Sequence, residues 1–194
     1  MLIRSEINGL VVSAPVLGPE GVEFLILTVI KNKKICPVAP RFTALIADPD
    51  TVDAIYVAWE AVRVRVGSVL NGLSIDIDDA IYQVLSKKKW KLEGDSIALA
   101  VFLKLHILFN NQFANYHNIV ATGAIRKKKD VYTIDCVEGV REKLGKICLI
   151  KNSRKKTAIF LPKGNAPELD IVNSVNDIWT VDNSLAFHCH HTAN

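Results

Sequence analysis

The sequence predicts a single α+β domain, in which short N-terminal β-strands precede alternating helices and strands. Two features lead to this prediction. Short runs rich in Val, Ile and Leu fill the first forty-five residues, and helical and strand patterns alternate from about residue 48 onward. A chain of 194 residues, 49% of them hydrophobic, is long enough to bury a substantial core without disulfides. We expect residues 1–47 to form the β-rich part of this domain, residues 48–187 its core and residues 188–194 a polar, frayed tail.

The N-terminal strands are expected at residues 10–16, 22–30 and 34–38. Because turn signals separate them and the connections are too short for a crossover helix, we expect antiparallel pairing. An amphipathic helix follows. Asp48, Pro49 and Asp50 with Thr51 supply N-cap chemistry, and apolar residues then recur at three- and four-residue steps as far as Leu70, before Gly72.

The second half of the chain alternates between helix and strand patterns. We expect strands at 81–85, 119–125, 131–134 and 157–161, helices at 97–109 and 138–147, and a short strand and a weak helix from residue 168 onward. The apolar run 97–109 contains Lys104 and His106. Since it is also shorter than the ~18 residues of a membrane span, it predicts a buried helix and no membrane anchor.

The net charge of +4 is unevenly distributed along the chain. Residues 1–80 carry a net charge of −3, residues 81–165 of +11 and residues 166–194 of −4. A basic middle segment is typical of nucleic-acid-binding surfaces. However, its charges concentrate in runs at predicted turns, 87–91, 126–129 and 154–156, and no aromatic residues interleave with them for base stacking. We therefore expect solvated turns and no nucleic acid, with a joint basic face for an acidic partner as the alternative.

The four cysteines, at positions 36, 136, 148 and 189, are sparse and widely spaced, which favours a reducing compartment over a disulfide scaffold. Residues 1–14 lack a basic segment followed by an unbroken apolar stretch, so they do not predict a signal peptide. We expect a cytoplasmic protein. Cys136 and Cys148 lie in or beside apolar segments and are expected to be small core residues.

The common cofactor motifs do not occur in the sequence. It contains neither a G-x-x-x-x-G-K-[ST] nor a G-x-G-x-x-G loop to hold phosphates, and neither H-E-x-x-H nor paired C-x-x-C for a metal. The segment His188, Cys189, His190, His191 offers zinc or copper ligands, but four consecutive residues can hardly surround one ion tetrahedrally. We therefore expect neither a cofactor nor a metal.

Ser96 is the candidate nucleophile, because it stands just after Gly94 at the start of the most apolar helix. Backbone amides at a helix start are available to an oxyanion, and a serine oxygen there could attack a carbonyl. The alternative is that Ser96 or Asp95 is a helix N-cap. As base, His106 is too far along the same helix, and His117 has no evident Asp partner. Lys143 can serve where burial disfavours its ammonium form, although a helical lysine is commonly an exposed ion-pair partner.

Four blocks in this order resemble the proteolytic domain of Lon proteases, which are Ser–Lys peptidases. Residues 93–98 (EGDSIA) are similar to the family's Asp-Gly-Pro-Ser-Ala-Gly turn, and residues 121–125 (ATGAI) to its Thr-Gly-Glu-Ile strand. Residues 137–144 (VEGVREKL) resemble its Gly-Gly-Leu-Lys-Glu-Lys-Leu helix, and residues 157–165 (TAIFLPKGN) the strand ending in Ile-Pro-Lys-x-Asn. The resemblance covers roughly residues 50–185. It implies the ribosomal-protein-S5-domain-2-like fold, with residues 48–187 as the proteolytic core.

The resemblance also implies the roles of individual residues. Ser96 would be the nucleophile, Lys143 its general base and Thr122 a hydrogen-bonding neighbour. The amides around Gly94, Asp95 and Ser96 would form the oxyanion site. A polypeptide would be the substrate of this ATP-independent serine endopeptidase. The family further implies a homo-oligomer or a separate AAA+ ATPase partner, since we expect the domain to stand without the usual ATPase.

The sequence departs from the family pattern near the site. Asp95 replaces proline, Ile97 and Ala98 replace smaller residues, and Ala124 replaces glutamate. Bulk beside the nucleophile would narrow the cleft, and an inward-pointing Asp95 carboxylate would repel an oxyanion. The alternative function is therefore a catalytically inactive Lon-like module that acts as a protein-interaction or regulatory partner of an ATPase.

Overall fold

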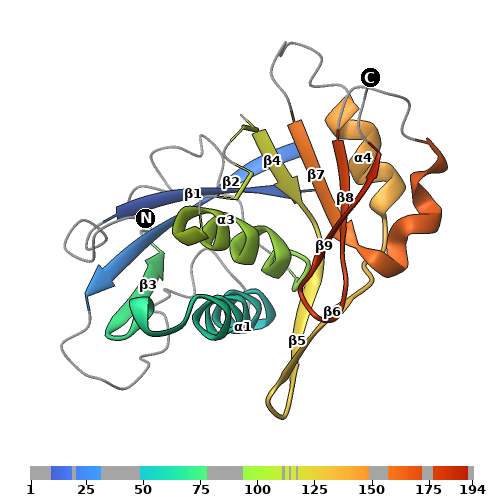
Figure 1. Ribbon diagram of the computed structural model, residues 1–194. Helices are drawn as coiled ribbons and strands as arrows, with labels where there is room; N and C mark the ends of the chain where they lie inside the picture. The colour runs from blue at the N-terminus through green and yellow to red at the C-terminus, as the bar shows by residue number, and fades with distance from the viewer. Residues whose placement is uncertain are drawn as a thin grey trace.

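A seven-stranded mixed sheet with helices on both faces organises this mixed α/β protein (Figure 1). Its strands lie in the order β3-β2-β1-β4-β7-β8-β9, and a separate hairpin pairs β5 with β6. The structure is a computed structural model that describes residues 10–18, 21–31, 49–77, 94–110, 112, 113, 115, 116, 118–148, 157–171 and 177–191. The expected strands at 34–38 and 81–85 and the basic runs at 87–91 and 154–156 lie outside these residues.

The N-terminal strands confirm the expected antiparallel start. β1 (Leu10–Gly18) and β2 (Gly21–Lys31) pair antiparallel from Leu10↔Val29 to Gly18↔Gly21. β1 also pairs in parallel with β4 (Asn118–Ala121), so both strands belong to the same sheet as the later elements. The antiparallel strand β3 (Leu73–Ile77) on β2 was not predicted from the sequence.

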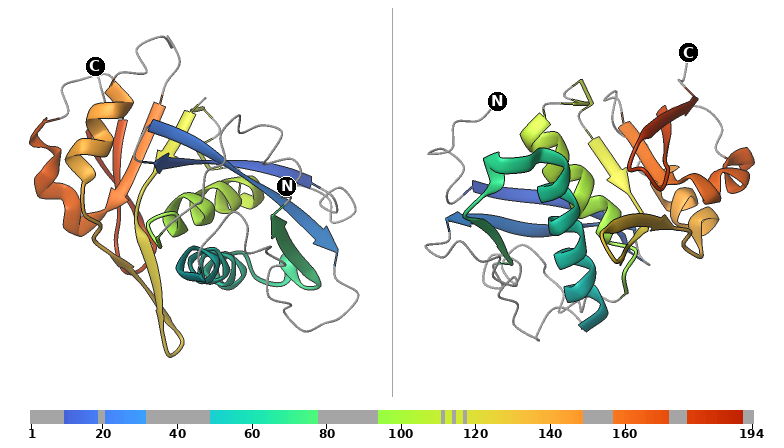
Figure 2. Two further views of the ribbon diagram at one scale, coloured as in Figure 1. Left: turned by 180° about the vertical axis from the view of Figure 1, so that it is seen from behind. Right: turned by 60° about the horizontal axis from the view of Figure 1, so that its bottom comes forward.

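The structure contains all three helices expected before residue 150, with their ends shifted by a few residues. They are the first amphipathic helix and the helices expected at 97–109 and 138–147. α1 (Pro49–Val66) begins with a proline, whose fixed φ suits a first helical turn. It passes into the 3₁₀ helix η1 (Gly67–Leu70), where Gly67 has a φ of +78°. α3 (Ala98–Asn110) packs beside α1 (Figure 2), and their buried side chains include Trp59 and Phe102.

Strand β7 (Thr157–Pro162) is apolar after Thr157, and these apolar residues are buried on both of its faces. Ala158 and Phe160 belong to the core that includes α1 and α3. Ile159 and Leu161 point to the opposite side, where they meet α4 (Val140–Cys148) through Val140 and Leu144. This opposite cluster sets the position of α4, and therefore of Lys143, relative to the sheet.

The C-terminal part differs from the expectation of a weak helix and a frayed tail. A 3₁₀ helix, η2 (Lys163–Ile171), starts directly after β7, and β8 (Asp177–Val181) pairs in parallel with β7. β9 (Phe187–His191) then pairs antiparallel with β8, so residues 188–191 are part of the sheet and not a tail. The turn between them is held by Asp182, whose carboxylate accepts hydrogen bonds from the amides of Ser184 and Ala186.

No helix within the described ranges is long and apolar enough to cross a membrane.

Candidate functional site

A pocket of about 320 Å³ lies where the loop before α3, the base of the β5–β6 hairpin and the start of α4 meet. The hairpin consists of β5 (Ala124–Lys128) and β6 (Val131–Asp135) and projects from the body of the molecule (Figure 1). The pocket lining combines a hydroxyl, a thiol, an amine, a guanidinium and two carboxylates. It consists of Gly94, Asp95, Ser96, Ala124, Arg126, Cys136, Val137, Glu138 and Lys143.

The Ser96 loop is fixed by backbone hydrogen bonds on both sides. Gly94 has a φ of +87°, a conformation that favours glycine, and its carbonyl accepts a 2.9 Å hydrogen bond from the Thr51 hydroxyl of α1. The Ser96 carbonyl accepts a 2.9 Å hydrogen bond from the Gly123 amide. The Ala98 amide donates to the Asp95 carbonyl over 3.1 Å, and α3 begins at this point. Ser96 therefore stands on a tethered turn at a helix start.

The expected strand at 119–125 is wrong in one respect, because the structure divides it into β4 and β5 at Thr122 and Gly123. The Gly123 carbonyl accepts a 3.0 Å hydrogen bond from the Leu99 amide, while its own amide donates to Ser96. The backbone groups of Gly123 therefore form hydrogen bonds with the start of α3 and not with a neighbouring strand of the sheet. The interruption joins the candidate nucleophile loop to the short link between β4 and β5 that carries Thr122.

Lys143 enters the pocket from the first turns of α4. The helix follows Gly139, which has a φ of +69°, and the Lys143 amide donates to the Gly139 carbonyl over 3.0 Å. The Lys143 side chain is half-buried, and its Nζ donates a 3.2 Å hydrogen bond to the hydroxyl oxygen of Thr122, which is 1% exposed. Burial lowers the pKa of Lys143 below its ordinary value, while the charges of Asp95 and Glu142 act in the opposite direction.

Arg126 is a site residue that sequence reasoning missed. It was expected at a solvated hairpin tip, but β5 continues to Lys128, and Arg126 lies in the middle of this strand, opposite Thr133. Its guanidinium forms an ion pair with the Asp95 carboxylate and lies 3.6 Å from that of Asp135. The sequence did contain a signal for this position. Side chains alternate between the two faces of a strand, so Arg126 lies on the same face of β5 as Ala124, which lines the pocket.

The bulky residues that follow Ser96 do not fill the pocket. Ile97 is 3% exposed and Ala98 is fully buried, and both belong to the core around α1 and α3. Ala124, which replaces the glutamate of the resembling Lon pattern, lines the pocket with a small side chain.

Cys136 corrects a second expectation, since it is exposed and lines the pocket instead of being buried in the core. Its backbone neighbour Val137 is held by Asn165, a buried side chain from η2. Asn165 accepts a 3.1 Å hydrogen bond from the Val137 amide and donates a 2.9 Å hydrogen bond to its carbonyl. This pairing fixes the pocket wall between β6 and α4.

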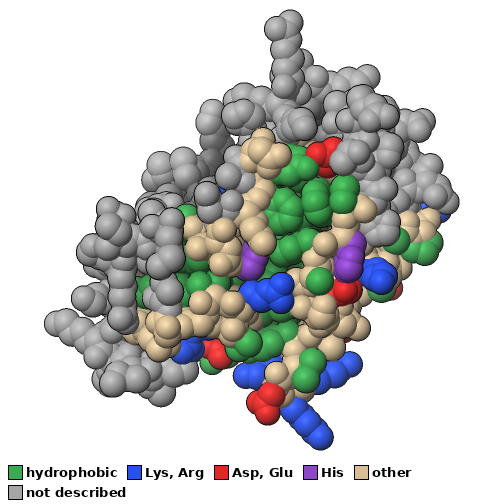
Figure 3. Space-filling view, viewed as in Figure 1, with side chains coloured by type: hydrophobic (Ala, Val, Ile, Leu, Met, Phe, Trp, Pro, Cys, Tyr) green, Lys and Arg blue, Asp and Glu red, His purple; other side chains and the backbone are tan. Residues whose placement is uncertain are grey.

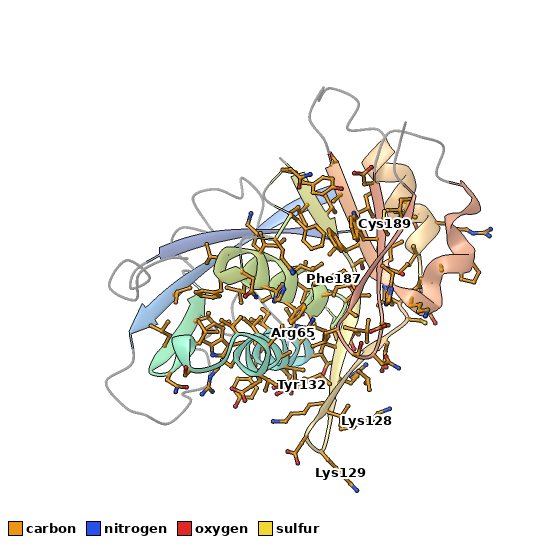
Figure 4. The ribbon with its side chains drawn as sticks, in the orientation of Figure 1. Arg65, Lys128, Lys129, Tyr132, Phe187 and Cys189 are labelled. Atoms are coloured by element: carbon orange, nitrogen blue, oxygen red, sulfur yellow. The ribbon has the colours of Figure 1, made fainter. Side chains whose placement is uncertain are left out.

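The basic residues at the tip of the hairpin extend away from the body. Lys and Arg side chains gather around the hairpin in Figure 3, and Figure 4 shows Lys128 and Lys129 near its tip. Lys127 instead lies over the ring of Tyr132, 5.7 Å from the ring centroid. The two other basic runs, 87–91 and 154–156, lie outside the described residues.

The histidine-rich segment lies on β9, where strand alternation directs His188 and Cys189 to opposite faces. His188 is engaged by Asp182, with 2.7 Å between the ring nitrogen and the carboxylate oxygen. Within the part of the chain that the structure describes, no three His, Cys, Asp or Glu side chains come together as a metal-binding group.

Comparison with known proteins gives no match to any family model and none to any curated protein.

Proposed function

We propose that this protein is a serine endopeptidase of the Lon-like Ser–Lys type, with the fold of the Lon proteolytic domain. The observation that carries the proposal is the pocket that Ser96 and Lys143 share. The lowered pKa of Lys143 supports it, because only a neutral amine can accept a proton. The hydrogen bond to Thr122 supports it further by orienting Nζ.

In the proposed first step, Ser96 Oγ attacks the carbonyl carbon of a peptide bond while Lys143 Nζ takes the hydroxyl proton. The carbonyl oxygen becomes an oxyanion. The proposed donors for this oxyanion are the amides of the 94–96 turn, as the resemblance implies, since the amides of Ala98 and Leu99 already donate to the carbonyls of Asp95 and Gly123. Collapse of the tetrahedral intermediate breaks the C–N bond. The leaving amine takes the proton from Lys143, and an ester remains on Ser96.

In the proposed second step, Lys143 removes a proton from a water molecule that attacks the ester carbonyl. The C–O bond to Ser96 breaks, Lys143 returns the proton to Oγ, and the carboxylic acid product leaves. Lys143 ends each cycle as the neutral amine, so the two steps balance without another reactant. The residues required are Ser96, Lys143 and the backbone of the 94–96 turn, with Thr122 in a positioning role.

The Asp95 carboxylate pairs with Arg126, which reduces its repulsion of an oxyanion. Its charge still raises the pKa of Lys143, but burial outweighs this effect. The buried position of Ile97 likewise favours an open site over the inactive-module alternative. The proposed substrate is a polypeptide in the cytoplasm. Assembly into a homo-oligomer or with an AAA+ ATPase follows the pattern of the Lon family and forms part of the same proposal.

The experiment is hydrolysis of an unfolded protein substrate, with the new N-termini identified by mass spectrometry. We expect cleavage by the wild type and loss of cleavage in Ser96→Ala and Lys143→Ala. Matched controls are Ser68→Ala, an exposed serine in η1, and Lys104→Ala, a half-buried lysine in α3. Both should cleave like the wild type. If all five proteins behave alike, the proposed function is wrong.

A further inference from the structure

The charges that line the pocket are arranged around Asp95. The lining carries two carboxylates, Asp95 and Glu138, and two cations, Arg126 and Lys143. Asp95 therefore has two cationic neighbours at the pocket and forms its ion pair with Arg126. An aspartate that pairs instead with Lys143 would favour the ammonium form of the lysine, which cannot act as a base.

Arg126 is held in place from its other side. Asp135 lies on the paired strand β6, directly opposite Ala124, and its carboxylate lies 3.6 Å from Arg126 Nε. The guanidinium thus bridges two carboxylates, one from the hairpin and one from the Ser96 loop. A planar guanidinium with several N–H donors suits this geometry, whereas an ammonium offers a single charged centre.

We propose that Arg126 is a positioning residue, which holds the Asp95 carboxylate on the hairpin side of the pocket and so leaves Lys143 available as a proton acceptor. This inference rests on the proposed function of Lys143. It assigns control of the reaction at Ser96 to a residue in the middle of strand β5 of the hairpin. Loss of the Arg126–Asp95 ion pair would free Asp95 to act on Lys143 and slow the reaction at neutral pH.

A second carboxylate, Glu142, also acts on Lys143. Glu142, beside Lys143 on α4, raises the lysine's pKa, as Asp95 does, and burial outweighs both. Glu138 and Cys136 line the pocket from the segment between β6 and α4.

The test measures the titration of Lys143 directly, by NMR of its side-chain ¹³Cε resonance, which is assigned by its disappearance in Lys143→Arg. Arg126→Gln should raise the midpoint of this titration by about one pH unit, the size expected when an opposite charge comes close. Arg126→Lys, which keeps the positive charge, should raise the midpoint by less than Arg126→Gln does. Lys128→Gln, which removes a charge from the same hairpin face two residues further on, should leave the midpoint unchanged.

Two further variants separate action through Asp95 from action through space. Asp95→Asn should lower the midpoint, and Asp95→Asn with Arg126→Gln should titrate like Asp95→Asn alone. The inference is overturned if Arg126→Gln leaves the midpoint in place, or if the double variant keeps the full upward shift of Arg126→Gln.

A parallel rate measurement distinguishes this inference from the proposed function. A one-unit shift leaves about tenfold less neutral amine at neutral pH, so peptide cleavage by Arg126→Gln should fall about tenfold there and recover at alkaline pH. If Arg126→Gln shifts the NMR midpoint but neither the wild type nor any variant cleaves peptides, Arg126 controls the titration of Lys143 and the peptidase proposal fails. If wild type cleaves and the midpoint is unmoved, the peptidase proposal stands and the role of Arg126 is refuted.

Discussion

Gly123 offers a quantitative test of how the Ser96 loop is joined to the sheet. A Cβ at this position would lie 2.8 Å from Leu99 Cδ2 and 3.0 Å from Pro162 Cγ. Both neighbours are buried, and the proline ring cannot rotate away. Gly123→Ala should therefore overpack the junction and lower the free energy of unfolding by about 1–3 kcal/mol. The backbone itself accepts alanine, because Gly123 is not among the residues with positive φ.

Gly145→Ala is the matched control. The same methyl group at Gly145, inside α4, would meet nothing within 4 Å. Alanine favours a helix over glycine, so this variant should gain about 0.5–1 kcal/mol. Urea denaturation measures both changes, and with a slope of about 2 kcal/mol per molar the Gly123→Ala midpoint should fall by roughly 0.5–1.5 M. Equal midpoints for the two variants, or a stabilised Gly123→Ala, would refute the packing described for this junction.

Three further outcomes are expected from the pocket wall and from Lys143. An alkylating thiol reagent should inhibit cleavage by modifying Cys136, which lines the pocket. Cleavage by Cys136→Ser should therefore resist the reagent, whereas Cys189→Ser, which removes the exposed thiol on β9, should stay sensitive. Equal sensitivity of the two variants would contradict this expectation. Asn165→Ala should lower the free energy of unfolding by about 1–3 kcal/mol in a denaturant titration, because both backbone groups of Val137 lose their partner; a neutral result would contradict it. Because the folded-state pKa of Lys143 lies below its unfolded value, its ammonium form destabilises the fold at neutral pH and this penalty fades as pH rises. The free energy of unfolding of wild type should therefore rise relative to that of Lys143→Met between pH 7 and pH 10, and parallel pH curves would be evidence against a lowered pKa.

Elements with strong local patterns were predicted well from the sequence. The apolar periodicity of α1, the continuous apolar run of α3 and the antiparallel β1–β2 pair follow from residue spacing and short connections. β7 was recognisable as a strand, and the structure explains its apolar character by burial on both faces.

The errors arose where tertiary hydrogen bonds decide the structure. The expected strand is interrupted at Thr122 and Gly123 because their amides donate to the carbonyls of Phe160 in β7 and of Ser96, which are remote in sequence. Residues 188–191 are polar and were expected to fray, yet pairing with β8 and the Asp182 turn make them a strand. Local sequence preferences do not predict either set of long-range hydrogen bonds.

The site shows the same division. A resemblance between short motifs pointed to Ser96, Lys143 and Thr122. The structure places Ser96 and Lys143 at one pocket and hydrogen-bonds Lys143 to the buried Thr122, while their catalytic roles stay a prediction. Arg126 and Cys136 were assigned to a solvated turn and to the core. Their true places depend on where the β5–β6 hairpin meets the Ser96 loop, and no short-range pattern encodes that meeting.

The pairing of Ser96 with Lys143 is tested most directly by labelling with a fluorophosphonate, which reacts with activated serine hydroxyls. Peptide mapping by mass spectrometry then identifies the modified residue. We expect one label per chain on Ser96, none on Ser96→Ala, and labelling of Lys143→Ala slowed by a factor of about 10² or more, the usual contribution of a general base. Labelling at another residue, or an unchanged rate in Lys143→Ala, would contradict the proposed pair.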